Sequence, residues 1–227
     1  EYLIHGEKRF VLNASLADVF IVLCREPKEG WMTLMVDREK DGVEVLPIEK
    51  MGLRMIPFGD LHFREVRVAL ESRIGREGEG MVHVNHCHQV MGLKNVAQAL
   101  GAVQGAFDQA MQYGKQREQF GRKLSQFQVI RHKLADMAVS IEVARWLTYK
   151  SATDYEQGKI HPGSLPIAQL EVGRRLMGVT DEALQIFGGY GYMAEQAIEH
   201  YFRDAWAIAV DLGTEEELKD RIAETIL

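Results

Sequence analysis

The chain has 227 residues, of which 46% are hydrophobic and 26% are charged, which is the composition of an ordinary globular protein. Its formal net charge is −6 at pH 7 with acidic and basic residues interspersed, which argues against a nucleic-acid partner. No apolar run approaches the roughly 20 residues that span a bilayer, and the opening residues EYLIHGEKRF lack the apolar core of a signal peptide. We therefore expect a soluble, cytoplasmic protein without a membrane span.

The first third of the chain shows short apolar runs separated by turn residues, among them KRFVLNA, DVFIVLCRE and WMTLMVD. This pattern predicts five or six antiparallel strands up to about Val68. A glycine-rich joint runs from Gly75 to Gly80, and the periodicity after it is helical. Because strands and helices do not alternate, we expect an α+β fold. A small antiparallel β domain over residues 1–75 would precede an up-and-down four-helix bundle over residues 76–227.

The first two helices are predicted from apolar residues at helical spacing. The first should bury a mostly apolar face formed by Val90, Leu93, Ala97, Leu100, Gln104 and Phe107. Ser125 is in the position of an N-cap for the second helix, which should end near Gly158. Trp146 and Tyr149 lie on this second helix, where we expect them to pack against its neighbours.

Three further helices follow from capping signals. The third should begin near Ser164, with Pro166 in its first turn, and should end at the glycines of LQIFGGYGY. The fourth is expected over residues 195–210. The last should begin at Thr214, because Thr214 and Glu217 have the spacing of a capping box.

Two stretches of the sequence could be considered as a phosphate-binding loop and as a metal site. The run GGYGY follows a helix and lacks the Lys-Ser/Thr of a phosphate loop, which argues against a phosphate loop and against a dinucleotide-binding βαβ unit. Metal-ligand spacing occurs at the start of the first helix, in His83, His86, Cys87 and His88. No further Cys, His or carboxylate motif completes a ligand shell, so we expect no metal site.

The order of several motifs resembles the acyl-CoA dehydrogenase family over essentially the whole chain. The motifs are GEKRFVLNA, GREGEGM, YGKQREQFGRKLSQFQVIRHKLADMA, LQIFGGYGYMAEQAIEHYFRDA and DLGT. The resemblance implies an FAD-dependent oxidoreductase of fatty acid metabolism that dehydrogenates an acyl-CoA or related thioester at its α,β positions. It also implies a homo- or hetero-tetramer that passes electrons to an electron-transfer flavoprotein, in the cytoplasm or, in a eukaryote, the mitochondrial matrix. The family's N-terminal helical domain is expected to be absent from this chain, which has the character of a fragment.

The same resemblance implies the residues that bind the cofactor. Arg117 would face the pyrophosphate of FAD, and the glycine turn would contact the FAD of a neighbouring subunit. The full set of cofactor-binding residues that the resemblance implies is Phe10, Arg117, Phe120, Gln185, Gly188, Gly189 and Thr214.

The catalytic positions of the family are replaced in this chain. The usual glutamate base stands at Leu212, and an alternative glutamate of some relatives at Met91. The arginine that helps to hold CoA is replaced by Gly92, and the threonine that reaches flavin N5 by Leu12. Removal of the substrate's α-proton requires a base, and Asp211 is the nearest carboxylate to the lost glutamate. Asp211 is therefore the candidate catalytic residue.

Two other interpretations fit these replacements. The chain could be a catalytically silent subunit that lends Arg117 and Gln185 to the flavin of a partner chain in a mixed tetramer. It could also be a relative with altered chemistry, such as the oxidation or desulfination of an unusual substrate, in which Leu12, Gly92 and Leu212 are adaptations.

Overall fold

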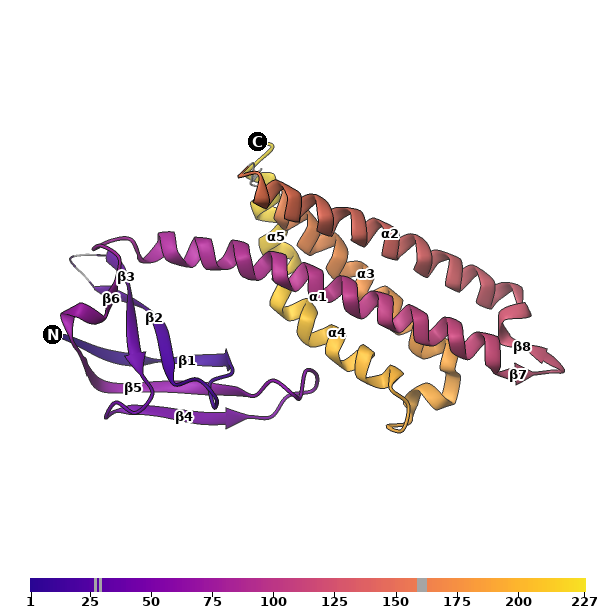
Figure 1. Cartoon of the computed structure of the whole chain (residues 1–227), viewed down its shortest axis with the longest axis horizontal. Helices are drawn as coiled ribbons and strands as arrows, with labels where there is room; N and C mark the ends of the chain where they lie inside the picture. The colour runs from indigo at the N-terminus through magenta and orange to yellow at the C-terminus, as the bar shows by residue number, and fades with distance from the viewer. Residues whose placement is uncertain (27, 29, 159–162) are drawn as a thin grey trace. The chain divides into compact units, whose positions relative to one another are not determined.

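The fold is that of a computed structural model, described here for residues 1–26, 28, 30–158 and 163–227. The chain divides into two compact units, Glu1–His88 and Gln89–Leu227. The first consists mainly of strands and the second mainly of helices, which confirms the predicted α+β class (Figure 1). The domain boundary between residues 75 and 76 stays a prediction.

Two three-stranded antiparallel sheets form the first unit. The strand order of one sheet is β1-β5-β4, from Tyr2–Leu12, Phe58–Val68 and Val43–Ile48. The order of the other is β2-β3-β6, from Val19–Glu26, Gly30–Asp37 and Arg73–Ile74. Up to Val68 the described residues therefore form five strands, within the expected range.

The core of the first unit follows the two-residue period of a strand. On β3, alternate residues Met32, Leu34 and Val36 are at most 2% exposed. They belong to one cluster with buried side chains from the other strands, which include Phe20, Leu61, Phe63, Val66 and Val68. Helix α1 (Gly80–Gln116) begins against β3. If Gly80 carried a β-carbon in ideal geometry (an ideal Cβ), that atom would lie only 2.7 Å from the backbone N of Met32, which is too close for a side chain. Only glycine therefore permits this approach.

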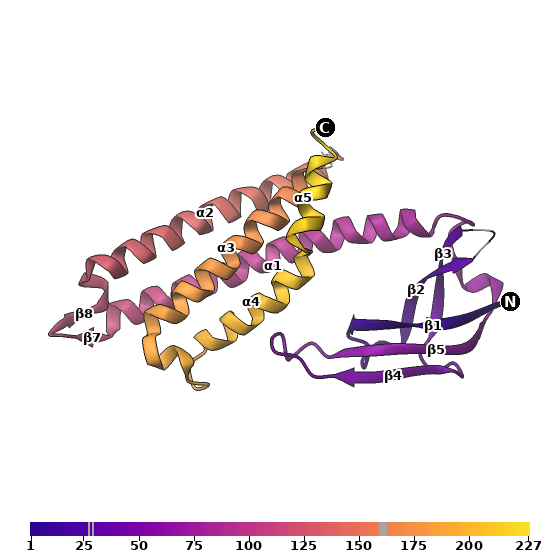
Figure 2. The same cartoon turned by 180° about the vertical axis from the view of Figure 1, so that it is seen from behind.

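The second unit is a bundle formed by the rest of α1 with α2 (Gln128–Glu156), α3 (Ser164–Phe187) and α4 (Ile198–Leu212). Figures 1 and 2 show these helices side by side, with a hairpin of β7 (Glu118–Gln119) and β8 (Arg122–Lys123) at one end of the bundle. The short helix α5 (Glu215–Ala223) and the C-terminus lie toward the other end. Within the described residues, no helix has both the length and the apolar character that crossing a membrane requires.

The predicted helix ends are partly confirmed. Helix α3 ends at Phe187 and is followed by Gly188 with φ +59°, and Gly158 after α2 has φ +63°. Thr214 caps α5, because its Oγ1 accepts a hydrogen bond of 3.2 Å from the Glu217 N–H. The prediction for Ser125 was wrong: this residue lies in the short 3-10 helix Leu124–Gln126, and α2 begins later, at Gln128. The fourth helix likewise begins at residue 198 and not at 195.

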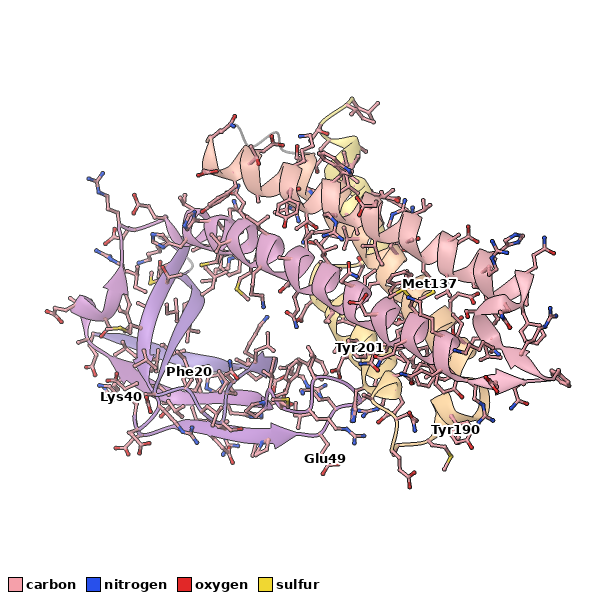
Figure 3. All side chains as sticks on the ribbon, turned by 45° about the vertical axis from the view of Figure 1, so that its right-hand side comes forward. Phe20, Lys40, Glu49, Met137, Tyr190 and Tyr201 are labelled. Carbon is pink, nitrogen blue, oxygen red and sulfur yellow. The ribbon has the colours of Figure 1, made fainter. Side chains whose placement is uncertain are left out.

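The buried face of α1 differs from the predicted one. Its fully buried side chains are Val96, Ala99, Val103, Ala106 and Ala110, whereas Val90 is 42% exposed. Small side chains allow close helix packing: an ideal Cβ on Gly105 would lie 2.6 Å from Oη of Tyr201 on α4, which Figure 3 labels. Trp146 and Tyr149 were also predicted wrongly, because they are 74% and 61% exposed.

Candidate functional site

The C-terminal ends of α1 and α3 are held together by aromatic side chains. The Tyr113 ring of α1 stacks on the Phe187 ring of α3, with centroids 4.1 Å apart and planes inclined by 13°. Arg117 follows α1, and its guanidinium carbon lies 5.1 Å from the centroid of the Tyr190 ring. Tyr190 belongs to the glycine turn at this end of the bundle (Figure 3). The structure therefore places Arg117 beside the glycine turn.

The β7–β8 hairpin presents Phe120 at its tip. The hairpin is closed by a 2.9 Å hydrogen bond from the Leu124 N–H to the Arg117 carbonyl. Phe120 has φ +52° and Gly121 has φ +76°, so two successive residues are left-handed. For a residue with a side chain this conformation costs roughly 1–2 kcal/mol. The Phe120 ring is 92% exposed, so it contributes little burial to offset this strain. Two successive left-handed residues are the geometry of a two-residue hairpin turn, and the Phe120 ring lies edge-on to the Phe127 ring with centroids 6.5 Å apart.

The glycine turn leaves its backbone uncovered. An ideal Cβ on Gly188 or Gly189 would meet no atom within 4 Å, and the Gln185 side chain is exposed. Gly191 differs, because an ideal Cβ there would lie 2.5 Å from the Leu184 carbonyl oxygen. Gly191 is therefore required for packing, whereas the first two glycines keep main-chain groups accessible to a ligand.

Five predicted residues thus gather at one end of the bundle, and we call them the hairpin–glycine cluster. They are Arg117, Phe120, Gln185, Gly188 and Gly189. Sequence reasoning missed Tyr190, whose ring faces the Arg117 guanidinium. The signal for it was weak, since a tyrosine between glycines is compatible with any exposed turn.

Asp211 and Thr214 lie at the opposite end of α3. Gln169, near the start of α3, donates a 2.9 Å hydrogen bond to the Leu212 carbonyl. Along α3, Gln169 and Gly188 are separated by roughly 30 Å at 1.5 Å per residue. Within one copy of the chain, Asp211 and Thr214 are therefore not brought together with the hairpin–glycine cluster.

The environment of Asp211 suits a proton acceptor. Its carboxyl is half-buried, and this burial raises its pKa, while the positive charge of Lys94 acts in the opposite direction. The neighbouring Leu212 is only 2% exposed and packs inside the bundle. Thr214 is exposed, and its hydroxyl already caps α5.

In the first unit, Phe10 is presented by an irregularity of β1. The pairing of β1 with β5 shifts between Lys8 and Val11, and Phe10 has φ +58°. Asp60 holds this bulge, because its carboxylate accepts the Phe10 N–H at 3.0 Å and the Arg9 Nε–H at 3.2 Å. The Arg9 guanidinium also lies 4.8 Å from the centroid of the Phe10 ring. The ring itself is 60% exposed, so it is available to a ligand.

The sequence also singled out Met91, Gly92 and His83, whose surroundings the structure defines. Met91 is 41% exposed, whereas Gly92 is buried with an ideal Cβ 3.0 Å from Gln169 Nε2. His83 Nδ1 lies 2.6 Å from the Thr33 hydroxyl oxygen, so this histidine has a partner in β3. Among the described residues, no three His, Cys, Asp or Glu side chains are grouped for a metal ion.

The fold defines a class of protein in which a helical bundle follows an antiparallel β unit. Family models match both parts: the acyl-CoA dehydrogenase middle domain over residues 1–66 and the acyl-CoA dehydrogenase C-terminal domain over residues 78–227. The chain belongs to the acyl-CoA dehydrogenase family.

Individual relatives agree with this assignment. The chain is 35% identical to cyclohexane-1-carbonyl-CoA dehydrogenase of Geobacter metallireducens, over 100% of the chain and 61% of the relative. It is 34% identical to a short-chain-specific acyl-CoA dehydrogenase of Clostridium acetobutylicum, over 96% of the chain and 59% of the relative. The structure of butyryl-CoA dehydrogenase from Megasphaera elsdenii matches with a TM-score of 0.95 at 34% identity, over 99% of this chain and 60% of that one. The chain thus spans about three fifths of the length of these relatives.

Proposed function

We propose that the protein to which this chain belongs is an FAD-dependent dehydrogenase that oxidises an acyl-CoA thioester at its α,β positions. The observation that carries the proposal is the hairpin–glycine cluster, which gathers the residues expected to contact the cofactor. The relatives named above are dehydrogenases, which favours an enzyme over a silent subunit.

The residues of the cluster fit the chemistry of FAD. Arg117 offers a planar cation to a pyrophosphate, and the Tyr190 ring beneath it limits its motion. The open backbone at Gly188 and Gly189 lets a flat ligand approach the main chain, and the exposed Phe120 ring offers a surface for stacking. Phe10 and Thr214 are proposed to contact the flavin as the family pattern implies.

The proposed chemistry needs a hydride acceptor and a base. Bound FAD would supply the hydride acceptor for the substrate's β-carbon. Asp211 is proposed as the base that removes the α-proton, because its half-buried carboxyl has a raised pKa and so retains a higher proton affinity than an exposed aspartate. Leu212 cannot serve, since it has no ionisable group.

The separation of the two sites along α3 supports an oligomer. With roughly 30 Å of helix between Gln169 and the glycine turn, the Asp211 end and the hairpin–glycine cluster of one copy belong to different flavin sites. We therefore propose a tetramer in which each flavin is contacted by two chains. An electron-transfer flavoprotein is the proposed electron acceptor.

The first test of the cofactor is the visible absorption spectrum and the FAD affinity of the full-length protein. Arg117→Ala should weaken FAD binding by about tenfold to a hundredfold, because it removes a charge-assisted hydrogen-bond donor. The matched control is Arg122→Ala on the same hairpin, whose guanidinium lies 3.9 Å from the Phe127 ring centroid. Equal FAD affinity in both variants and the parent protein would refute the cofactor site.

The second test is the anaerobic addition of a panel of acyl-CoAs, which should bleach the flavin. Asp211→Asn should slow this reduction by about a hundredfold to ten-thousandfold, the usual contribution of a general base. The control is Asp181→Asn, which removes an exposed carboxylate on α3. A flavin that no acyl-CoA bleaches would overturn the proposed reaction, and unchanged reduction in Asp211→Asn would overturn the proposed base.

A further inference from the structure

Two buried amide side chains hold the last turn of α4. Asn95 Nδ2 on α1 donates a 2.9 Å hydrogen bond to the Asp211 carbonyl. Gln169 Nε2 on α3 donates one of the same length to the next carbonyl, that of Leu212. The last carbonyls of a helix have no partner within the helix, so each of these amides satisfies a group that the helix leaves open. The end of α4 is thus tied to two other helices of the bundle.

These amides are kept in place despite an energetic cost. Asn95 is 5% exposed and Gln169 is 6% exposed. Their second polar atoms, Asn95 Oδ1 and Gln169 Oε1, are buried and accept no hydrogen bond from the described residues. A buried acceptor without a donor destabilises a fold, whereas apolar side chains of similar size would pack without this penalty. The two amides therefore do more than fill space.

Gly92 belongs to the same arrangement. An ideal Cβ at this position would lie 3.0 Å from Gln169 Nε2 and 3.0 Å from Leu165 Cδ2. A larger side chain at position 92 would thus compete for space with the amide group that binds the Leu212 carbonyl. A residue larger than glycine at position 92 would therefore require the Gln169 side chain to shift.

The last turn of α4 places its successive side chains in different surroundings. Leu212 is 2% exposed, and its Cδ1 lies 3.2 Å from an ideal Cβ on Gly173 of α3. The preceding residue, Asp211, remains half-buried. The turn ends at Gly213, whose φ of +108° is unfavourable for other residues and whose N–H donates to the Val210 carbonyl at 3.2 Å.

The geometry points to Asn95 and Gln169 as positioning residues, which fix the last turn of α4 and thereby direct the Asp211 carboxylate toward the substrate. We call the two hydrogen bonds from Asn95 and Gln169 to the last turn of α4 the clamp. The role of Asp211 in this inference rests on the proposed function, whereas the clamp itself does not. It explains how a chain without the family's glutamate presents a carboxylate one residue earlier.

Hydrogen exchange of the full-length protein, followed by mass spectrometry, tests the clamp without any assay of activity. Gln169→Met and Asn95→Leu keep the side-chain size and remove the donor. Each should accelerate exchange about tenfold in the peptide that covers residues 210–214, because the turn opens locally. The double variant should show a non-additive effect, since both amides hold one turn.

The matched control is Thr180→Val on α3. Thr180 is 0% exposed, and its hydroxyl donates only within its own helix, to the Leu176 carbonyl at 2.8 Å and the Met177 carbonyl at 3.2 Å. This variant should leave exchange at residues 210–214 unchanged. A uniform acceleration over the whole chain in the amide variants, or none at the turn, would overturn the clamp.

Flavin reduction separates positioning from structural support. At saturating acyl-CoA, the amide variants should reduce the flavin at least about tenfold more slowly while the FAD affinity stays as in the parent protein. Faster exchange with unchanged reduction would overturn the positioning role. If no acyl-CoA reduces the parent protein, the proposed function fails, and the exchange measurements still decide whether the turn is held.

Discussion

Replacing Leu212 by glutamate introduces the residue that the family resemblance predicts for this position, and the burial of this side chain argues that the new carboxyl will not act as a base. The Leu212 side chain is 2% exposed inside the bundle. Removing a buried leucine costs about 1.5–3 kcal/mol, and a buried carboxyl without a partner adds about 1–3 kcal/mol. We therefore expect Leu212→Glu to lose roughly 2.5–6 kcal/mol of stability, a large part of a typical total of about 5–15 kcal/mol.

The loss should depend on pH in a defined direction. Burial disfavours the charged form, so the new carboxyl should have a higher pKa in the folded state than in the unfolded state. Between these two pKa values the folded protein holds more protons, and the variant loses stability as the pH rises, by at most about 1.4 kcal/mol per pH unit. Urea unfolding of the full-length variant at pH 5 and pH 8 measures this change in the free energy of unfolding.

The control is Leu212→Met, which conserves volume and should cost less than about 1.5 kcal/mol at either pH. A Leu212→Glu protein that is as stable as its parent at both pH values would show that this side chain lies outside the bundle core. A faster bleaching of the flavin in Leu212→Glu would refute the assignment of Asp211 as the base.

Three other substitutions separate stability from ligand binding. Hydrogen bonds from Arg174, and then from Lys219, lower the pKa of Glu215 to about 2. The ionised Glu215 carboxylate therefore stabilises the fold above its unfolded pKa of roughly 4.3, and this stabilisation is lost as the pH falls toward 2. Glu215→Gln should flatten this acid dependence in unfolding curves between pH 2 and pH 6, and an unchanged dependence would contradict the ion pair. Phe120→Gly should change stability by less than about 1 kcal/mol, because relief of the left-handed strain offsets the added chain entropy, yet weaken FAD binding in a titration about tenfold; unchanged FAD affinity would argue against the ring as a ligand contact. Thr214→Ala should cost about 1 kcal/mol in thermal unfolding through the lost N-cap, and no loss would contradict the cap.

Local signals in the sequence predicted much of the helical unit. The C-terminal glycine of α3, the glycine after α2 and the capping threonine of α5 each act within one turn of chain, so sequence spacing alone locates them. Ser125 has the right residue type for a cap, but the chain forms a 3-10 turn there and α2 starts after it. A residue type therefore permits a cap without requiring one.

Contacts between distant residues were beyond the reach of the sequence. The buried face of α1 consists largely of alanines, which carry a weak hydrophobic signal, so the larger Val90 and Leu93 suggested a different face. Asn95 and Gln169 bind main-chain carbonyls on another helix, and a carbonyl has no sequence signature. The only signal in the sequence is a polar residue among the apolar residues of a helix face, and this signal does not predict which carbonyl the side chain binds.

Gly92 and Leu212 are the positions near the end of α4 where the family resemblance predicts an arginine and a glutamate, and their packing favours a rebuilt site over the decay of an unused one. Decay would leave space where the arginine and the glutamate were lost, whereas an ideal Cβ at Gly92 already lies within 3.0 Å of Gln169, and Leu212 is packed in the bundle. The donor atom that occupies this space also binds the Leu212 carbonyl. Gln169 thus contacts both of these positions, which links their surroundings to one another. At the other end of the bundle, the left-handed hairpin after α1 and the uncovered glycines after α3 are the features on which the proposed cofactor site rests.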